Sequence, residues 1–436
     1  MRYLPVMDPS AAASPPPPGA LRIAVVGAGP VGLALALHAA RVLPQARVTV
    51  FDARPAAQDV SADPRTLALS LGSVQLLRRL GAWPEAAGHP ILEVHVSQAP
   101  PSLPAQAAVR LHAREQGVPM LGAVLAYGPL VAALQQAWER ACRQEGPARL
   151  ASCFGQAVTA LREHASGVEV DAGIVQDFDL VVVAEGGVYA GAAGLPRSGT
   201  SGSSGISGST DAARAGVAPR EPLRHDYGQT AWVGTAQLAD APAGTAFERF
   251  TRDGPVALLP LGPAVDGVSP RALVWCVPAA HDPVGALEPA QRLAVLGALL
   301  PREAGRLVAL SSLKAFPLGL IAERSLVQGR LARIGNAAQT LHPVAGQGLN
   351  LGLRDAFTLV QALREHPHDT DAALRQVEWA RAPDRWSMIA TTDFLARSFT
   401  WRAPGVAAAR GLALAALQAA APLKRLLARQ MMYGRR

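Results

Sequence analysis

The sequence contains no run of about 18 uninterrupted apolar residues, the length that a membrane-spanning helix requires. Its first twenty residues, MRYLPVMDPSAAASPPPPGA, also lack the apolar segment of a secretory signal. The run Pro15–Pro18 cannot join a helix or a sheet ladder, so residues 1–20 are expected to be a disordered leader. These absences predict a cytoplasmic protein without a spanning helix.

Cysteine and charged residues are also scarce. The three cysteines, Cys142, Cys153 and Cys276, lack the spacing of a metal site or a redox motif, so we expect reduced, buried thiols and no bound metal. Charged residues make up 17% of the chain and apolar residues 50%, which excludes a largely disordered protein. A length of 436 residues exceeds what one hydrophobic core usually holds, so two domains are expected.

Acidic residues are missing from the last part of the chain. Residues 401–436 contain seven Arg and Lys and no Asp or Glu, so they carry most of the net charge of +8. A nucleic-acid binder usually presents basic residues over a folded face, and we therefore expect no nucleic-acid partner. The segment 404–436 is apolar as well as basic. It predicts either a helix docked on the protein body or a helix that binds the inner membrane peripherally or a partner protein.

The order of the expected elements indicates an α/β fold. A buried strand in 21–29, a helix over 30–43 and a second strand in 46–54 form the β–α–β unit of a parallel sheet. Between 225 and 278 the pattern changes to that of an antiparallel sheet, which we expect in an inserted domain. Further elements are expected as follows: helices over 127–146, 287–309, 348–366, 371–400 and 404–432, and strands over 177–187 and 330–336.

The first glycine-rich turn is Gly27-Ala28-Gly29-Pro30-Val31-Gly32, placed between a strand and a helix. Such glycines let the backbone approach a pyrophosphate, and the helix N-terminus supplies N–H donors and the positive end of a dipole. The second strand ends at Asp52, which can accept hydrogen bonds from a ribose diol. The turn therefore predicts a dinucleotide site, and an acidic residue there suits FAD or NAD better than NADP.

A second glycine-rich loop follows the strand that ends at Gly335. It reads Gly335-Asn336-Ala337-Ala338-Gln339-Thr340-Leu341-His342-Pro343-Val344-Ala345-Gly346-Gln347-Gly348-Leu349-Asn350-Leu351, and a helix begins near Gly348. This is another helix N-terminus directed at an electron-rich group. The two loops together could hold opposite ends of one long cofactor.

This second loop and its continuation to Ala356 resemble the flavin motif of the group A flavoprotein aromatic hydroxylases, closest to the ubiquinone-biosynthesis hydroxylases of the UbiH, UbiF and UbiI type. The resemblance extends over roughly 21–432 and includes ADPRTLALSLGSVQLLRRLGAW, YGQTAWVG and FERFTRDGPVALLPL. It implies a p-hydroxybenzoate-hydroxylase-like fold: a Rossmann-like FAD-binding domain, an inserted antiparallel-sheet substrate domain and a C-terminal helical segment. It also implies a monooxygenase that uses FAD, NAD(P)H and O2 to hydroxylate the ring of a polyprenylated phenol in ubiquinone biosynthesis, through a flavin C4a-hydroperoxide.

The resemblance also assigns site residues. Arg65 would lie along the ribityl or pyrophosphate part of FAD, and Asn336 would face the ribitol. Pro343 and the backbone of 346–351 would lie against the isoalloxazine, with the N–H groups near Asn350 and Leu351 stabilising negative charge on the reduced flavin. The expected cofactor-binding set is Gly27, Gly29, Pro30, Gly32, Asp52, Arg65, Glu185, Gly335, Asn336, Gly346, Gln347, Gly348, Leu349, Asn350 and Leu351. His342 and Pro343 are the expected flavin-facing catalytic pair, although His342 could equally be a histidine packed against Pro343.

Several positions depart from the family pattern. Gly335 is followed by Asn336 instead of Asp, which removes a charge-assisted hydrogen bond to FAD. The middle motif is Ala184-Glu185-Gly186-Gly187, and its basic residue is missing unless Arg197 takes that place. These departures leave two alternatives open: a non-catalytic or weakly FAD-binding subunit of the ubiquinone-biosynthesis complex, and a flavin monooxygenase of another hydrophobic aromatic. No residue is an obvious base for a phenol.

Domain limits follow from the same reading. The FAD-binding domain is expected to combine 21–95, 127–190 and 310–370, and the substrate domain 96–126 and 217–309. A Gly/Ser-rich loop is expected over 191–216, and the C-terminal helical segment over 371–436. Tyr227, Trp232, Phe247, Phe250 and Trp275 are candidates either for an apolar substrate cavity or for an ordinary core.

Overall fold

The structure is a computed structural model of the chain. It describes residues 20–61, 63, 65–99, 108–185, 221–398 and 405–435. The expected leader 1–20, apart from Ala20, and the expected Gly/Ser-rich loop 191–216 lie outside the described residues.

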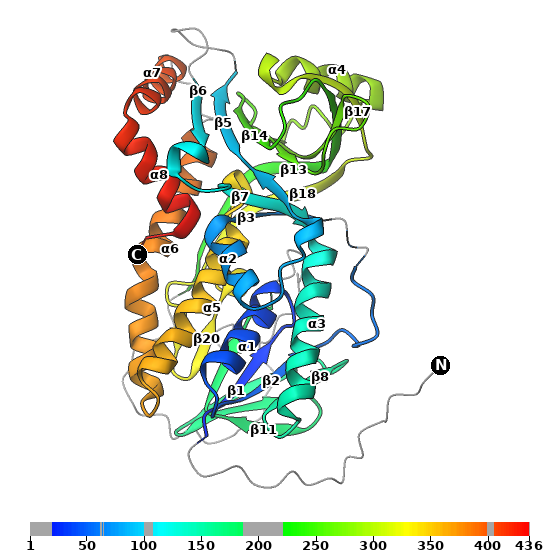
Figure 1. The fold of residues 1–436 in the computed structure, drawn as a ribbon. Helices are drawn as coiled ribbons and strands as arrows, with labels where there is room; N and C mark the ends of the chain where they lie inside the picture. The colour runs from blue at the N-terminus through cyan, green and yellow to red at the C-terminus, as the bar shows by residue number, and fades with distance from the viewer. Residues whose placement is uncertain are drawn as a thin grey trace.

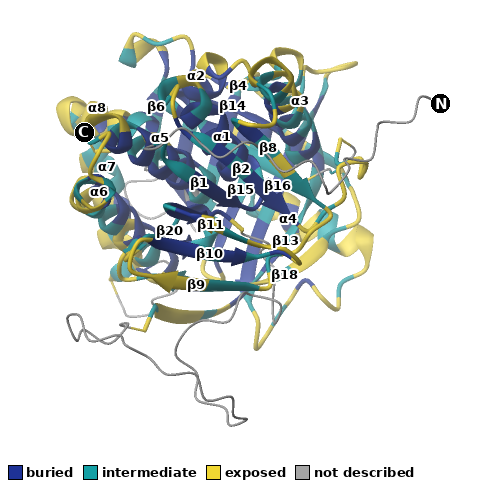
Figure 2. Cartoon of the chain, turned by 90° about the horizontal axis from the view of Figure 1, so that it is seen from below, coloured by how far each residue is buried: buried dark blue, intermediate teal, exposed yellow. Residues whose placement is uncertain are grey.

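The lower half of the molecule is built on a six-stranded sheet (Figure 1). Its strand order is β19 (Val327–Gln328), β20 (Leu331–Arg333), β12 (Leu180–Val183), β1 (Arg22–Val26), β2 (Arg47–Asp52) and β8 (Leu150–Phe154). The strands from β20 to β8 are parallel. The buried apolar runs of β1 and β12 fit a sheet covered on both faces, and Figure 2 shows β1 in the interior.

Two layers cover this sheet. The helices α1 (Pro30–Val42), α3 (Tyr127–Glu145) and α5 (Gly348–Glu365) pack into the main core with β1 and β2. On the other face, Val168 and Phe178 belong to a small antiparallel sheet and pack against Ala24 and Val26. Its strands are β9 (Ala160–His164), β10 (Gly167–Asp171) and β11 (Val175–Phe178). This is the parallel sheet that the first β–α–β unit predicted, in the Rossmann-like arrangement that the family resemblance implied.

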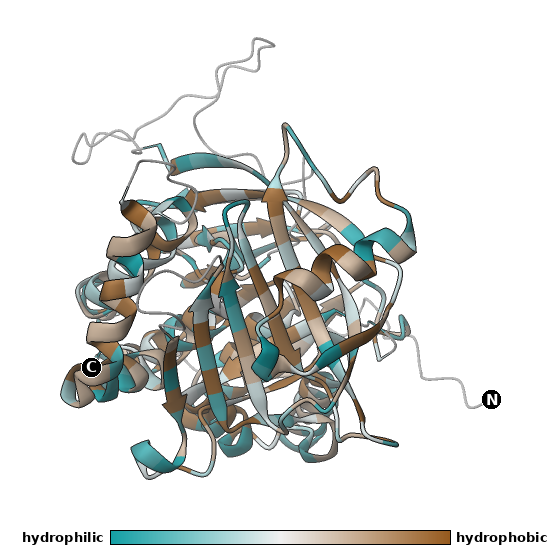
Figure 3. Cartoon of the chain, turned by 90° about the horizontal axis from the view of Figure 1, so that it is seen from above, coloured by the Kyte–Doolittle hydropathy of each residue, from teal (hydrophilic) through white to brown (hydrophobic). Residues whose placement is uncertain are grey.

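A nine-stranded sheet forms the upper half. Its order is β21 (Gln339–Thr340), β18 (Lys314–Ala322), β13 (Leu223–Ala239), β16 (Val268–Pro278), β15 (Pro255–Pro260), β14 (Thr245–Phe250), β5 (Glu93–Gln98) and β6 (Ala108–His112), with β17 (Arg306–Leu310) also paired to β13. The pairing is antiparallel as expected, except that β14 and β5 run parallel. The helix α4 (Pro289–Leu299) covers one face, and Figure 3 shows hydrophobic bands on the strands near it.

Smaller elements join the two halves. The three-stranded sheet β3 (Thr66–Ser70), β7 (Gly122–Ala126) and β4 (His89–Ile91) lies with α2 (Leu71–Arg79) between them (Figure 1). The helices α6 (Thr370–Ser398), α7 (Val406–Ala419) and α8 (Ala421–Tyr433) lie along one side. A buried ion network ties α5 to α6: Arg381 pairs with Asp355 at 2.7 Å and with Asp384 at 2.8 Å.

Two expected helices differ in the structure. The helix expected over 287–309 ends at Leu299, because Pro301 interrupts it and Gly305 turns the chain at φ +89° into strand β17. The helix expected over 404–432 is two helices bent by 93°. The break lies at Ala420, whose backbone is not helical, and Pro422 begins the new helix.

The sheets suggest domain limits close to those expected. We propose that the large sheet is the substrate domain and the six-stranded sheet the FAD-binding domain. Lys314–Ala322 was expected in the FAD-binding domain, but it pairs with β13 in the large sheet, so we assign it to the substrate domain. The strand β7 was expected in the substrate domain, but it pairs with β3, so we assign it to the FAD-binding domain.

Candidate functional site

The first glycine-rich turn has the geometry of a phosphate-binding loop. Gly27 has φ +106°, and a Cβ there would lie 2.8 Å from the Glu185 nitrogen. A Cβ on Gly32 would collide with the Gly27 carbonyl oxygen. A Cβ on Gly29, in contrast, would meet only the Tyr127 hydroxyl, at 3.9 Å. Gly27 and Gly32 therefore make the turn possible, and Gly29 leaves its backbone open where α1 begins with Pro30.

Asp52 ends β2 beside this turn, as expected. Its Oδ2 accepts a hydrogen bond from the Ala28 amide at 2.6 Å, and its Oδ1 accepts from the Arg54 amide at 2.8 Å. The Arg54 guanidinium pairs with the carboxylate at 3.0 Å and donates to the Ala28 carbonyl at 2.9 Å. Burial opposes ionisation of Asp52, but the hydrogen bonds from Arg54 and Ala28 outweigh it and hold the pKa of Asp52 below its ordinary value.

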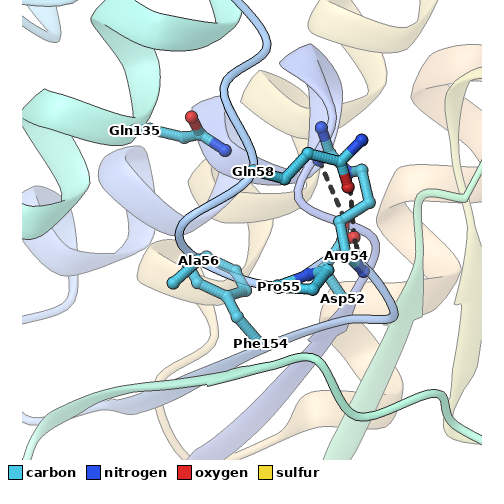
Figure 4. A pocket seen from close by; sticks show the side chains of 7 residues that line it. All are labelled: Asp52, Arg54, Pro55, Ala56, Gln58, Gln135 and Phe154. Atoms are coloured by element: carbon cyan, nitrogen blue, oxygen red, sulfur yellow. Dashed lines mark hydrogen bonds and ion pairs between the residues drawn. The ribbon is translucent and has the colours of Figure 1, made fainter.

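A small hollow opens next to this ion pair (Figure 4). Its lining residues are Asp52, Arg54, Pro55, Ala56, Gln58, Gln135 and Phe154. Carboxylate, guanidinium and amide groups beside an aromatic ring are suited to a ribose and a base. Arg54 was not among the residues that the sequence predicted. Its position two residues after Asp52, where the strand ends, was the available signal.

The second glycine-rich loop contains two left-handed glycines, Gly335 at φ +60° and Gly346 at φ +57°. Gly348 begins α5, and a Cβ there would have only the Asn336 Oδ1 nearby, at 3.9 Å. The first N–H groups of a helix have no carbonyl partner within it, so Gly348, Leu349 and Asn350 present donors beside Asn336. The expected donor Leu351 is different, because its N–H bonds to the Gln347 carbonyl inside the helix at 3.0 Å.

The Asn350 side chain holds this loop in place. Its Oδ1 accepts from the Ser70 amide at 2.8 Å and from the Ser73 hydroxyl at 2.7 Å. Its Nδ2 donates to the carbonyls of Ala68 and Gly346 at 3.1 and 3.0 Å. All of its hydrogen-bonding capacity is thus directed at the protein. The Asn350 side chain positions the start of α5, and its side-chain amide is not presented to a ligand, whereas its backbone N–H remains a donor in the first turn.

The two loops meet at one point. A Cβ on Gly352 would lie 2.7 Å from both the Gly335 Cα and the Val31 Cγ2, and a Cβ on Gly335 would lie 3.2 Å from that same Val31 atom. Val31 follows Pro30 in the first turn of α1. The N-terminal ends of α1 and α5 are therefore in contact, although more than 300 residues separate them in the sequence.

His342 is a neutral, buried histidine. Its Nδ1 accepts from the Val344 amide at 3.2 Å, so its Nε2 carries the proton and donates to Gln229 Oε1 at 2.9 Å. Burial lowers the pKa of His342 to about 4. Tyr227 packs edge-on against the ring. Both ring nitrogens are engaged, so we propose that His342 positions the Pro343 loop on β13 and does not carry a proton.

The remaining expected residues surround the first turn. The Arg65 guanidinium lies 4.1 Å from the centre of the Tyr127 ring and pairs with Asp63 at 2.8 Å. The Tyr127 hydroxyl would lie 3.9 Å from a Cβ on Gly29, so Arg65 lies near the first turn through Tyr127, and its contact with FAD stays a prediction. Glu185 lies against Gly27, and desolvation together with the charge of Asp52 raises the pKa of Glu185. The rest of the middle motif and Arg197 lie outside the described residues.

These features fit a bound FAD. The open backbones of Gly29 and Gly348 would take its phosphates and its flavin edge, and the Asp52–Arg54 pair would take the adenosine end. Within the described residues, no group of three or more His, Cys, Asp or Glu side chains could hold a metal ion.

The candidate aromatics divide between two environments. Phe247 and Trp275 are buried in the core under α4, with Trp232 packed against it. Phe250 packs with Val344 of the second loop, and Tyr227 packs against His342. Of these five aromatics, Phe250 and Tyr227 are therefore on the side of the second glycine-rich loop.

Comparisons with known proteins support the binding of FAD. A family model described as an FAD binding domain matches residues 227–391. The chain is 30% identical to the 3-demethoxyubiquinol 3-hydroxylase of Escherichia coli over 92% of its own length and 96% of that protein. It is 36% identical to the ubiquinone hydroxylase UbiL of Rhodospirillum rubrum over 47% of this chain, which spans 48% of that relative.

A solved structure shows the same fold. Klebsiella pneumoniae HpxO, in complex with FAD and uric acid, superposes with a TM-score of 0.64 at 18% identity, covering 95% of this chain and 97% of that one.

Proposed function

The chain belongs to the family of FAD-dependent hydroxylases of ubiquinone biosynthesis, and from this we propose that it is a flavoprotein monooxygenase that hydroxylates the ring of a polyprenylated phenol. One observation carries the proposal: the N-terminal ends of α1 and α5 meet at Val31, Gly335 and Gly352, and each leaves an open glycine backbone. A single elongated FAD can contact both ends.

Each part of the chain has a distinct task in this reaction. Bound FAD supplies the electron transfer from NAD(P)H and the activation of O2. The Asp52–Arg54 pair and the Gly29 backbone bind and orient the adenosine diphosphate half. The amides of Gly348, Leu349 and Asn350 stabilise negative charge at the flavin edge. The use of NAD(P)H is part of the proposal and is supported by the family resemblance.

The test is a substitution that places a side chain over the open backbone at Gly29 without straining the backbone. Gly29 has φ −79°, so Gly29→Val should fold but block the phosphates. Wild-type protein incubated with FAD should show the visible absorbance of bound flavin and should oxidise NAD(P)H faster with a prenylated phenol. Gly297→Val is the matched control, because Gly297 lies in α4 with no atom within 4 Å of a Cβ. Folded wild-type protein that binds no flavin would refute the proposal.

The same variant separates the enzyme from a non-catalytic subunit, an alternative that Asn336 and Glu185 favour. The gene should restore ubiquinone synthesis in a hydroxylase-deficient strain, and the Gly29→Val variant should not. Equal rescue by both forms would favour the structural subunit. Loss of rescue together with turnover of another hydrophobic aromatic would favour a different substrate.

The C-terminal helices suggest how a polyprenyl substrate reaches the site. No single helix in the described residues is long and apolar enough to cross a bilayer, and α7 with α8 meets that test only as a bent pair. Lys424 is buried and pairs with Glu115 at 3.1 Å, so α8 is docked on the body. Leu412, Leu423 and Leu426 stay more than half exposed.

We propose that these leucines and the neighbouring Arg425 and Arg429 attach the protein peripherally to the inner face of an anionic membrane. Vesicles with anionic lipid should sediment the wild-type protein. A variant with Leu423 and Leu426 replaced by Ser should remain in the supernatant, and binding that is unchanged in this variant would contradict the proposal.

A further inference from the structure

Glu248 is a carboxylate in an apolar setting that the site described above does not use. It lies in β14, and its Oε1 is buried without a hydrogen-bond partner among the described residues. An unpaired buried carboxyl lowers the stability of the fold, so we expect Glu248 to have a functional reason for its position. Burial raises the pKa of Glu248 to about 8.

The direction of the side chain follows from the strand. Residues two apart on a strand share a face. Phe247, next to Glu248, lies in the core under α4, and the following Arg249 donates to the Leu299 carbonyl at the end of α4. Ala246 and Phe250, two residues away on either side, pack respectively into the main core and against Val344 of the second glycine loop. The Glu248 side chain therefore faces away from α4 and toward the second glycine-rich loop.

The sheet register surrounds Glu248 with apolar side chains on that face. Glu248 pairs with Ala257 on one side and with Val96 on the other. Ala257 pairs with Val274, and Val274 with Val233. Directly paired residues point to the same side of a sheet. We call Val233, Val274, Ala257, Glu248 and Val96 the lower row, because it crosses the underside of the large sheet.

The lower row is not sealed. Each of its five members keeps partial exposure. On the α4 face, the neighbouring Val256, Leu273 and Trp275 are exposed by 2% or less. The central strands of the nine-stranded sheet are thus more tightly covered on the α4 face than on the lower face, which is partly exposed and apolar apart from Glu248. At one end of the row, Val344 packs with Phe250, Val96 and Leu395, which brings the loop after Pro343 next to Glu248.

We propose that the lower row holds the substrate of the hydroxylase and that Glu248 is the base that accepts the proton of its phenolic hydroxyl. This inference rests on the proposed function and names the group that function lacked. The apolar row would contact the ring and the beginning of the prenyl chain, and the single carboxylate would bind the hydroxyl.

The proton transfer balances. The phenolic O–H bond breaks, its electron pair stays on the oxygen, and the proton forms a neutral carboxylic acid at Glu248. The negative charge on the ring oxygen makes the ring more nucleophilic toward the oxygen atom derived from O2. Glu248 returns the proton to the same oxygen when the ring carbon loses its hydrogen, and that hydrogen leaves in the water formed from the second oxygen atom. NAD(P)H supplies the two electrons.

Among the described residues, the elements packed around Glu248 present two further titratable groups: Cys276, and His342 in the loop that contains Val344, whose pKa of about 4 lies well below that of Glu248. Cys276 on β16 is buried, and burial together with Glu248 raises the pKa of its thiol. The paired positions on β15 and β5 are Ala257 and Val96, which do not titrate. The pH dependence of the step should therefore come from Glu248, with Cys276 as the group to exclude.

The first test is binding to the FAD-loaded protein. Calorimetry would compare a 2-prenylphenol with its O-methyl ether, which cannot donate a proton. At a pH above the pKa of Glu248, where its carboxylate is charged, wild type should bind the phenol about tenfold more tightly than the ether, as expected for a hydrogen bond to a charged group. Glu248→Gln should reduce that preference to within about twofold, whereas Glu303→Gln should keep it. Glu303 pairs with Arg110 away from this face.

The second test is turnover. Glu248→Gln should keep flavin binding but form hydroxylated product about 100-fold more slowly, and the pH limb near the pKa of Glu248 should disappear. Cys276→Ala should keep that limb. An unchanged preference and pH profile in Glu248→Gln would overturn the role of Glu248 while leaving the proposed function intact. A wild-type holoenzyme that hydroxylates no phenol would overturn both.

Discussion

A Cβ on Gly352 would lie 2.7 Å from the Gly335 Cα, so α5 and the turn before it are in backbone contact. Gly352→Ala should push α5 away from Val31 and misalign the two cofactor loops. We expect a loss of about 1–3 kcal/mol in the free energy of unfolding, and a larger relative loss of FAD affinity. Chemical denaturation and flavin titration measure the two. Gly297→Ala in α4 should instead be neutral or slightly stabilising.

The Asp52 carboxylate should matter through its charge. Asp52→Asn would remove the charged partner of Arg54 and weaken the bond to the Ala28 amide, which loosens the adenosine end of the site and should weaken FAD binding by about tenfold to a hundredfold. Because the pKa of Asp52 is held below its ordinary value, the carboxylate stays ionised and this contribution is lost only as the pH falls through that lowered value. Asp179→Asn, which breaks a surface pair with Arg22, should leave FAD affinity unchanged. Equal losses in both variants would contradict this role.

Two asparagines at the second loop should respond oppositely to the same change. Asn336→Asp places a carboxylate near the first turn of α5, where the helix dipole and the ribitol hydroxyls favour it, so FAD should bind up to about tenfold more tightly. Asn350→Asp would set a carboxylate oxygen against the carbonyls of Ala68 and Gly346 and should destabilise the fold. Fluorescence titration with FAD and thermal melts would measure FAD affinity and Tm in both variants. An Asn336→Asp variant with weaker FAD binding, or an Asn350→Asp variant with an unchanged or higher Tm, would refute the prediction.

His342 makes stability depend on pH. Its pKa is about 4 in the folded protein against an ordinary 6.5, so the unfolded chain takes up the proton first as the pH falls. The contribution of His342 to the free energy of unfolding therefore has its full value above pH 6.5. It falls toward pH 4 by about 1.4 kcal/mol per pH unit. His38, buried with a pKa of about 4, adds a similar decline. His342→Gln should flatten part of the curve of Tm against pH, and the exposed His281→Gln should not.

Glu248 changes the stability of the fold with pH in the direction opposite to His342. Its folded pKa of about 8 lies above the ordinary 4.5, so the unfolded chain ionises first and stability falls as the pH rises from 4.5 to 8. Glu248→Gln removes this cost. Its Tm should exceed that of the wild type at pH 8 and match it near pH 4.5, in differential scanning calorimetry. A Tm lower than wild type at pH 8 would mean that Glu248 is structurally required.

The sequence was informative where chemistry is local. The glycines of 27–32, Asp52 and the start of α5 near Gly348 follow from short patterns, and the structure has each of them at the end of the expected element. The positions of Arg54 and Tyr127 at the first turn could not be predicted, because they depend on which side chains fold back over that turn. The sequence could not predict on which face of the large sheet the Glu248 side chain lies or what surrounds it, because this depends on which strands pair with β14 and in what register.

Long-range contacts also decided the roles of two expected residues. The engagement of His342 with Gln229, and of Asn350 with Ser70 and Ser73, joins positions more than 100 residues apart. No local pattern contains such partners. The break at Ala420 was more accessible, because Pro422 is visible in the sequence.

The parallel pairing of β5 with β14 has a consequence for handling the protein. The chain leaves the α2 region, contributes β5 and β6 to the distant large sheet, and returns to form β7 beside β3. Neither half has a complete set of strands without the other. Cutting the gene between the two sheets would leave open sheet edges on both fragments, so expression of isolated halves should give aggregates, and the intact chain should melt in a single transition.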